Sequence, residues 1–240
     1  MTEPISIVMV TYNRLPFTKK VIEHLIERTT TPFRLIMVDN GSVDGTQDYI
    51  NSLPSGVIKR FIPLPENAGL QRAKNFGLEY VTSELFVDTD NDCLCPLLSP
   101  DWLARLVGYM HDYPAFGAIA LRPQVLVGVG PIFKGAPEIV QNNVVGGSLR
   151  IMRTEVIKSL GGWEDINDSR REEWTICNKL RNNNWKVGYA RDIFTYHLFG
   201  ESNWGYAEGI EHYHNPASAI YAKDQEYDPI TCRPVQPGNE

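Results

Sequence analysis

Short apolar runs rich in β-branched residues alternate with helix-like segments through the first half of this 240-residue chain. Residues 5–11 and 33–39 have the near-continuous apolar pattern of strands that are buried on both faces. Between them, Phe17, Val21 and Leu25 recur at helical spacing. This order predicts an α/β fold in which helices cover both faces of a mostly parallel sheet.

The same rhythm extends toward residue 90 and then becomes less regular. Before that point, we expect helices at 46–53 and 70–81 and strands at 57–62 and 85–88. The glycine- and proline-rich stretch 126–136 is expected to be an irregular excursion of the chain outside the helices and strands. Beyond residue 100, the predicted helices are 102–113, 154–160 and 171–180, and the predicted strands are 116–121, 144–152, 186–190 and 194–197.

The charge and the apolar runs exclude several classes of protein. A formal net charge of −6 argues against a general nucleic-acid binder, which needs a basic surface. No apolar run approaches a membrane span, and the N-terminus lacks a signal-peptide core. The four cysteines show no zinc-type spacing, so we expect free thiols in a reducing compartment. These features predict a cytoplasmic protein without a membrane span.

Polar side chains stand at the ends of three predicted strands. Asp39 and Asp88 end two of them, and the first strand runs into 11–13. Ligands of parallel sheets bind beyond these carboxyl ends. Residues 88–92 also place three carboxylates within five positions, where they repel one another unless they are screened. The cluster is either a site for a hard cation with a diphosphate or a solvated acidic turn.

Four segments in order resemble the family 2 nucleotide-sugar glycosyltransferases of GT-A fold. They are Ile7 to Arg14, Val38 to Thr46, Asn67 to Gly77, and Val87 to Asp90. Further matches reach about Ser202, and they comprise Gly146-Gly147-Ser148, Gly161-Gly162-Trp163, Glu172-Glu173, and His197 with Gly200 and Ser202.

The resemblance implies a Rossmann-like, mostly parallel sheet flanked by helices, with a smaller mixed acceptor-side half. It implies one GT-A domain over 1–225, divided into a nucleotide-binding half, 1–95, and an acceptor half with lid, 96–225. The stretch 199–206 is the candidate lid, and 226–240 is expected to be a loosely ordered tail.

The implied activity is metal-dependent transfer of a sugar from a UDP- or TDP-sugar to an acceptor hydroxyl, with inversion by single displacement. The acceptor is a glycan or another hydroxyl compound. A non-catalytic nucleotide-sugar binding module and a nucleotidyltransferase are the alternatives. No feature of the sequence sets the sugar, the acceptor or the oligomeric state.

For the donor, the resemblance assigns Thr11, Tyr12 and Asn13 to the nucleotide base. Asp39 would accept the imide N–H of uracil or thymine, since an ionised carboxylate only accepts. Arg72 would approach the nucleotide or its phosphates. Strand packing for Thr11 and turn capping for Asp39 are the structural alternatives. On the same helix as Arg72, we expect a solvated charge at residue 74 and a structural side chain at residue 75.

For the metal and the sugar, the resemblance places Asp88 at the ribose or its metal-bound surroundings. It places Asp90 and His197 on a divalent cation, Mn2+ or Mg2+. Asn91 and Asp92 depart from the family pattern and leave the ligand set open. Gly147 would lie beneath the donor sugar, or within a β-bulge. Near the acceptor the family has an aromatic residue, and Trp163 stands there unless it packs in the core.

For catalysis, the resemblance makes Glu173 the general base that takes the acceptor proton. The family usually has aspartate at this position. Two other acids, Asp168 and Glu172, stay open as rivals because the surrounding register departs from the family pattern. An acidic first turn that complements the helix dipole is the structural alternative.

Overall fold

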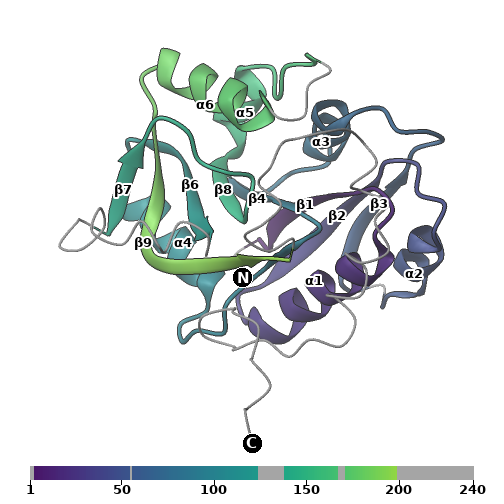
Figure 1. Ribbon diagram of the computed structural model, residues 1–240. Helices are drawn as coiled ribbons and strands as arrows, with labels where there is room; N and C mark the ends of the chain where they lie inside the picture. Colours follow the sequence, from purple (N-terminus) through teal and green to yellow (C-terminus); the bar gives the residue numbers. More distant parts are fainter. Residues whose placement is uncertain (1–2, 55, 124–137, 167–170, 199–240) are drawn as a thin grey trace, which may run out of the picture.

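The computed structural model of the protein describes residues 3–54, 56–123, 138–166 and 171–198 (Figure 1). Within these residues the strands form one nine-stranded sheet in the order β3-β2-β1-β4-β8-β6-β9-β5, and β7 pairs with β9. The candidate lid 199–206, the tail 226–240 and Asp168 lie outside the described residues.

The N-terminal half of the sheet is parallel, as predicted. Thr11 pairs with Asp39 and Val10 pairs with Asp90, so the polar strand ends share one rim. The strands of this half are β1 (Ile5–Thr11), β2 (Phe33–Asp39), β3 (Ile58–Pro63) and β4 (Leu85–Asp90), and its helices are α1 (Leu15–Arg28), α2 (Thr46–Ser52) and α3 (Leu70–Leu78).

The second half of the sheet is mixed. Strand β8 (Arg150–Arg153) runs antiparallel to both β4 and β6 (Phe116–Pro123), and β6 runs parallel to β9 (Lys186–His197). Strand β8 thereby joins the two halves of the sheet (Figure 1). The remaining elements are β5 (Cys93–Leu94), β7 (Ile139–Asn142), α4 (Trp102–Asp112), α5 (Thr154–Ser159) and α6 (Glu172–Asn182).

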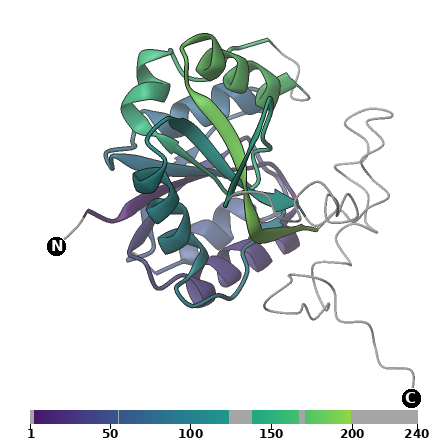
Figure 2. The same ribbon diagram turned by 90° about the vertical axis from the view of Figure 1, so that its left-hand side faces the viewer.

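Two apolar clusters cover the two faces of the sheet, and Figure 2 shows helices on both sides. One cluster packs α1 and α4 against the sheet through residues such as Leu25 and Leu106. The other uses Leu78, Ile157 and Ile176, from α3, α5 and α6. No helix among the described residues has the length and apolarity that a membrane span requires.

The structure differs from the predicted elements mainly in the second half. The predicted strand 144–152 is confined to β8, because residues 146–148 form a loop with polar contacts. The two strands predicted within 186–197 are one strand, β9, whose pairing with β6 shifts register. Strands β5 and β7 were not predicted, since two and four residues are too few for a periodic signal.

Candidate active site

Asp39 ends β2, and within the part of the chain that the structure describes only one of its two carboxylate oxygens is hydrogen-bonded. Its Oδ2 accepts hydrogen bonds from the Ser42 backbone N–H (3.0 Å) and the Gln47 Nε2 (2.7 Å). Its Oδ1 is buried and has no hydrogen-bond partner within the described residues. The carboxylate therefore stabilises the following turn through Oδ2, and Oδ1 can still accept a hydrogen bond. A buried oxygen without a hydrogen bond is rare in folded proteins.

Thr11, at the end of β1, belongs to a buried hydroxyl network. Its Oγ1 lies 2.8 Å from Oγ1 of Thr18 and accepts a hydrogen bond from Nδ2 of Asn91 at 3.1 Å. Asn91 also donates to Thr18 (3.0 Å). The structure thus favours the packing alternative for Thr11. It also shows why Asn91 departs from the acidic pattern, because its amide faces α1 rather than the rim.

The turn after β1 is fixed by the loop after β2. The Asn13 backbone N–H donates to Oγ of Ser42 (2.7 Å), and Oδ1 of Asn13 accepts from the Val43 N–H (2.9 Å). Asn13 is buried, while Tyr12 beside it is partly exposed. These bonds make Asn13 part of the loop scaffold and leave Tyr12 as the accessible side chain of the predicted base-binding segment.

Four charged side chains form a buried network between the two halves of the sheet. Arg150 donates from Nε and Nη2 to the two oxygens of Asp88, both at 2.9 Å, and from Nη2 to Glu172 at 2.7 Å. The Lys74 ammonium lies 2.9 Å from Asp88 and 3.3 Å from Glu172. Two cations thus balance two carboxylates, as buried charges require.

This network changes two of the sequence-based expectations. Asp88 is fully buried with both oxygens bound by Arg150 and Lys74, so it faces the interior and is not available to a ribose. The prediction that Lys74 is a solvated charge is wrong. Burial alone would lower the pKa of Lys74, but Asp88 and Glu172 outweigh burial and raise it well above its ordinary value.

Glu172 and Glu173, at the start of α6, have opposite environments. Burial alone would raise the pKa of Glu172, but Lys74 and Arg150 lower it to about 2. Arg150 and Lys74 also act on Glu173, but more weakly. Burial and then the charge of Glu172 raise its pKa above the ordinary value. Glu172 is therefore a locked structural anion, whereas Glu173 has the basicity that proton transfer needs.

Trp163 occupies the core. It is buried, its indole N–H donates to Glu172, and its ring meets Phe86 edge to face at 6.4 Å. The Asn75 side chain makes two hydrogen bonds of 2.8 Å with the backbone of Trp163, which confirms the structural role predicted for Asn75. At Gly162 (φ +64°), a Cβ atom would clash with Oδ1 of Asn75, so a glycine is required there. The structure thus favours packing over stacking on an acceptor for Trp163.

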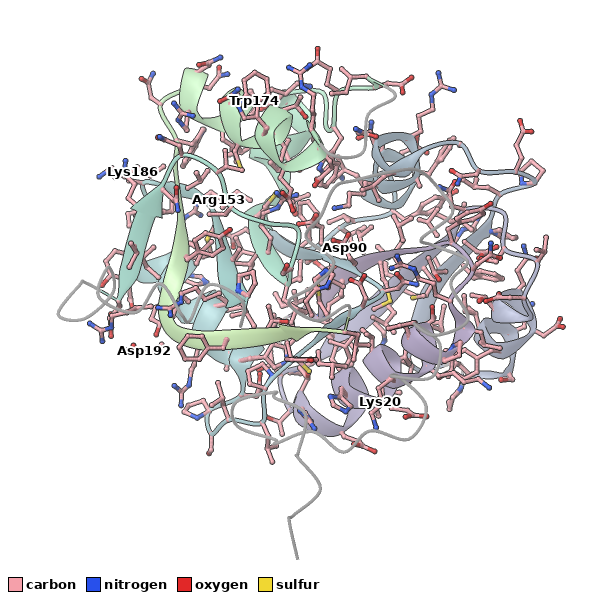
Figure 3. All side chains as sticks on the ribbon, viewed as in Figure 1. Lys20, Asp90, Arg153, Trp174, Lys186 and Asp192 are labelled. Atoms are coloured by element: carbon pink, nitrogen blue, oxygen red, sulfur yellow. The ribbon has the colours of Figure 1, made fainter. Side chains whose placement is uncertain are left out.

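Asp90 and Glu173 meet at Gly147. The Gly147 backbone N–H donates to Oε1 of Glu173 (3.2 Å), and a Cβ at Gly147 would lie 3.4 Å from Oδ2 of Asp90 and 3.0 Å from Nζ of Lys74. Asp90 is 32% exposed, whereas Asp88 and Asp92 are buried. Burial raises the pKa of Asp90 to about 6 against the opposing charge of Lys74. In the view of Figure 3, Asp90 is labelled near the centre.

His197 ends β9 beside Asp92. Its Nε2 lies 3.3 Å from Oδ1 of Asp92, and Arg14 donates to Oδ2 of the same carboxylate at 2.8 Å. The potential ligand atoms of Asp92, Cys93 and His197 all lie within 4.8 Å of one another. Among the described residues, His197 is therefore grouped with Asp92 and Cys93, whereas Asp90 contacts Lys74 at 3.6 Å.

Arg72 lies at the surface in an ion pair with Asp165 (2.6 Å), and the two side chains are 60% and 43% exposed. The structure brings Asp90, Gly147 and Glu173 together and leaves Arg72 outside that group. Sequence reasoning missed Arg150. Its one signal was a charged residue inside the apolar run 149–152, which implies a buried partner.

Comparison with known proteins identifies related sequences. The model of the family described as Glycosyl transferase family 2 matches residues 6–161. The uncharacterized glycosyltransferase YwdF of Bacillus subtilis is 32% identical over 90 residues, which cover 37% of this chain and 32% of that protein. The teichoic acid poly(glycerol phosphate) polymerase of Staphylococcus epidermidis is 31% identical over 90 residues, 37% of this chain and 12% of that protein. The chain thus spans a third or less of these two relatives.

Solved structures share the fold. The mannosyltransferase PcManGT from Pyrobaculum calidifontis, in complex with GDP-Man and Mn2+, matches with a TM-score of 0.72 and 20% identity over 85% of this chain and 59% of that one. TarS 1–349 of S. aureus, in complex with UDP-GlcNAc, matches with a TM-score of 0.63 and 14% identity over 91% and 66%. The described sheet with its flanking helices thus has the GT-A arrangement.

Proposed function

Because the chain belongs to glycosyl transferase family 2, we propose that it moves a sugar from a nucleotide-sugar donor to an acceptor hydroxyl with the help of a divalent cation. One observation carries the proposal. A partly exposed carboxylate, Asp90, and a carboxylate of raised pKa, Glu173, flank Gly147 at the carboxyl end of the parallel strands. That edge is where ligands of such sheets bind.

The free oxygen of Asp39 supports a uracil or thymine base. Either base offers one imide N–H, which suits a single acceptor such as Oδ1. Guanine presents two adjacent N–H donors and pairs best with both oxygens of a carboxylate. Oδ2 of Asp39 is already occupied by Ser42 and Gln47. We therefore propose a UDP- or TDP-sugar as donor, although PcManGT was solved with GDP-Man.

The chemistry of the accessible side chains fits a divalent cation. Asp90 is the partly exposed carboxylate of the acidic cluster, and His197 is 24% exposed, so solvent reaches both proposed ligands. Carboxylate oxygen and neutral imidazole suit Mn2+. When bound, the cation would neutralise negative charge on the departing nucleoside diphosphate. PcManGT and GalNAc-T7 were each solved with a nucleotide or nucleotide sugar and Mn2+, which supports this assignment.

Within the protein, Glu173 is the proposed base. Its Oε1 is held by the Gly147 N–H, and its raised pKa favours taking a proton from an acceptor hydroxyl. Gly147 leaves room for the donor, because any side chain there would press on Lys74 and Asp90. The acceptor oxygen would attack the anomeric carbon on the face opposite the leaving diphosphate, so the configuration would invert. No covalent enzyme intermediate is needed.

Donor hydrolysis tests the proposal directly. A set of nucleotide sugars is incubated with the protein and Mn2+, and release of the nucleoside diphosphate is measured. We expect hydrolysis of a UDP- or TDP-sugar that requires Mn2+ and is lost in Asp90→Asn. Asp192→Asn is the matched control, since Asp192 is exposed and lies at an outer edge in Figure 3. Binding of UDP with Mn2+ but no turnover with any donor or acceptor would instead support a binding module.

Asp39→Asn should weaken the binding of UDP, whereas a substitution of an exposed acid nearby should not. The asparagine side chain has one acceptor oxygen and one N–H₂ group. If the oxygen accepts from Ser42 and Gln47, the N–H₂ group faces the N–H of the base, and the hydrogen bond to the base is lost. Loss of a hydrogen bond to a charged group costs about 1.5–3 kcal/mol, or roughly ten- to a hundredfold in Kd. Calorimetric titration with UDP measures this. Asp48→Asn, an exposed acid on α2, should bind like the wild type. Equal Kd values in both variants would remove Asp39 from the base site.

A further inference from the structure

We infer that Asp92, Cys93 and His197 form a binding site for a thiophilic divalent cation of the Zn2+ class, at the junction of β5 and β9. The site differs from the proposed Asp90 cation site by its thiol ligand. It does not rest on the transferase proposal, because metal binding is measured without any sugar donor.

The backbone brings the three side chains together. Cys93 and His197 are directly opposite each other in the antiparallel β5–β9 ladder, so their side chains project from the same side of the sheet. Asp92 precedes Cys93, and the Leu198 N–H donates to its carbonyl at 2.8 Å, which extends the pairing by one step. The site is therefore built on paired backbone and not on one loop.

Two of the three distances between the ligand atoms match a tetrahedral metal site. Oδ1 of Asp92 lies 3.3 Å from Nε2 of His197 and 3.6 Å from Sγ of Cys93. Zinc bonds of 2.0–2.3 Å at tetrahedral angles separate neighbouring ligand atoms by about 3.3–3.6 Å. For the third pair, a ring nitrogen of His197 lies within 4.8 Å of Sγ of Cys93, so the three side chains already gather around one point. Three protein ligands would leave one open position for water.

The types of ligand atom determine which metal the site prefers. Thiolate with imidazole favours Zn2+ over Mn2+ or Mg2+, which prefer oxygen. The thiol of Cys93 now donates to Asp92, and burial raises its pKa. Metal binding would therefore displace the thiol proton to solvent, and the sulfur would bind as thiolate. Cys93 is buried, and the partly exposed His197 gives the cation its route in.

Arg14 completes the surroundings. Its guanidinium donates to Oδ2 of Asp92 at 2.8 Å and so leaves Oδ1 facing Cys93 and His197. This is the hydrogen-bonded support that metal-binding carboxylates use, while its positive charge opposes a cation. Thiolate and carboxylate together balance a dication, so the bound site with Arg14 carries one net positive charge. Occupancy would also take His197 away from the cation proposed at Asp90.

Cobalt absorption tests the site. The full chain is freed of metal with a chelator and titrated with Co2+, which gives a near-ultraviolet thiolate charge-transfer band only when a cysteine binds it. We expect the band in the wild type and in Cys95→Ser, a neighbouring buried cysteine whose Sγ contacts the His24 carbonyl instead. Cys93→Ser should lose the band. Zn2+ should displace Co2+ and abolish the wild-type band. Mn2+ should not, because a site with a thiolate ligand binds Mn2+ more weakly than Co2+.

Folding and stability give a second measurement. Zn2+ should raise the melting temperature of the wild type and of Cys95→Ser, because a ligand that binds only the folded state stabilises it. It should raise that of Cys93→Ser much less. If Cys93→Ser does not fold, His197→Gln replaces it, since His197 is partly exposed, and it should weaken Co2+ binding at least about tenfold. No thiolate band in the wild type, or an unchanged band in Cys93→Ser or His197→Gln, would overturn the inference.

Discussion

Replacing Glu173 with glutamine should lower kcat by about 10²–10⁴-fold, the contribution of a positioned general base. Glutamine keeps the shape and can still accept the Gly147 N–H, but it cannot take a proton. The melting temperature and the affinity for UDP with Mn2+ should stay near those of the wild type, because the buried cations Lys74 and Arg150 form their ion pairs with Asp88 and Glu172. Steady-state transfer kinetics and a thermal melt measure the two effects.

The neighbouring acid provides the contrast. Glu172→Gln removes a buried anion that faces Lys74 and Arg150, so it should lower stability far more than Glu173→Gln does. A variant of Glu173 that keeps near-normal turnover would reject it as the base. If Glu172→Gln then proved stable but inactive, the base would be assigned to Glu172.

The pH profile gives a second readout of the same assignment. The raised pKa of Glu173 means that its carboxylate, the form that accepts a proton, becomes populated only above the usual range for a glutamate. We expect kcat in the wild type to rise with pH through the pKa of this group and then level off. In Glu173→Gln the residual rate should lack this step. A step that persisted in the variant would belong to another group.

The parallel half of the fold could be predicted because its first strands are near-continuous apolar runs and its first helix repeats apolar residues at helical spacing. Residues 5–11 and 33–39 were predicted with the bounds that β1 and β2 have. In the second half, tertiary pairing determines the elements. Strand β8 is only four residues long, and it exists because Arg150 and its neighbours pair with both β4 and β6. Local pattern carries little information about such a strand.

The sequence predicted which types of residue form the candidate site, but not which of these side chains contact one another. The acidic run 88–92 was recognised, yet sequence spacing does not show which carboxylate turns inward. The structure turns Asp88 toward Arg150, 62 positions away, and leaves Asp90 partly exposed. Likewise Lys74 looks like any polar helix residue until α6 places Glu172 beside it. Contacts of this sequence separation follow from the fold and not from a motif.

Arg150→Met should be among the most destabilising substitutions in the chain. Methionine fills much of the buried volume but leaves Asp88 and Glu172 with Lys74 as their one remaining cation in this network. Breaking a buried ion pair from one side costs about 3–5 kcal/mol. For a domain of this size, that corresponds to a fall in melting temperature of roughly 6–20 °C.

Arg72→Met is the matched control, because it removes the same guanidinium from a pair with Asp165 whose side chains are 60% and 43% exposed. Solvent already screens that pair, so its loss should cost at most about 1 kcal/mol. Denaturant unfolding of the two variants measures both costs on one scale. Equal, small losses would mean that water reaches the Asp88–Arg150 pair, and the low pKa assigned to Glu172 would then have no structural cause. A large loss for Arg150 alone would confirm that the buried network stabilises the fold, including its contact with Glu172 in the first turn of α6, next to Glu173.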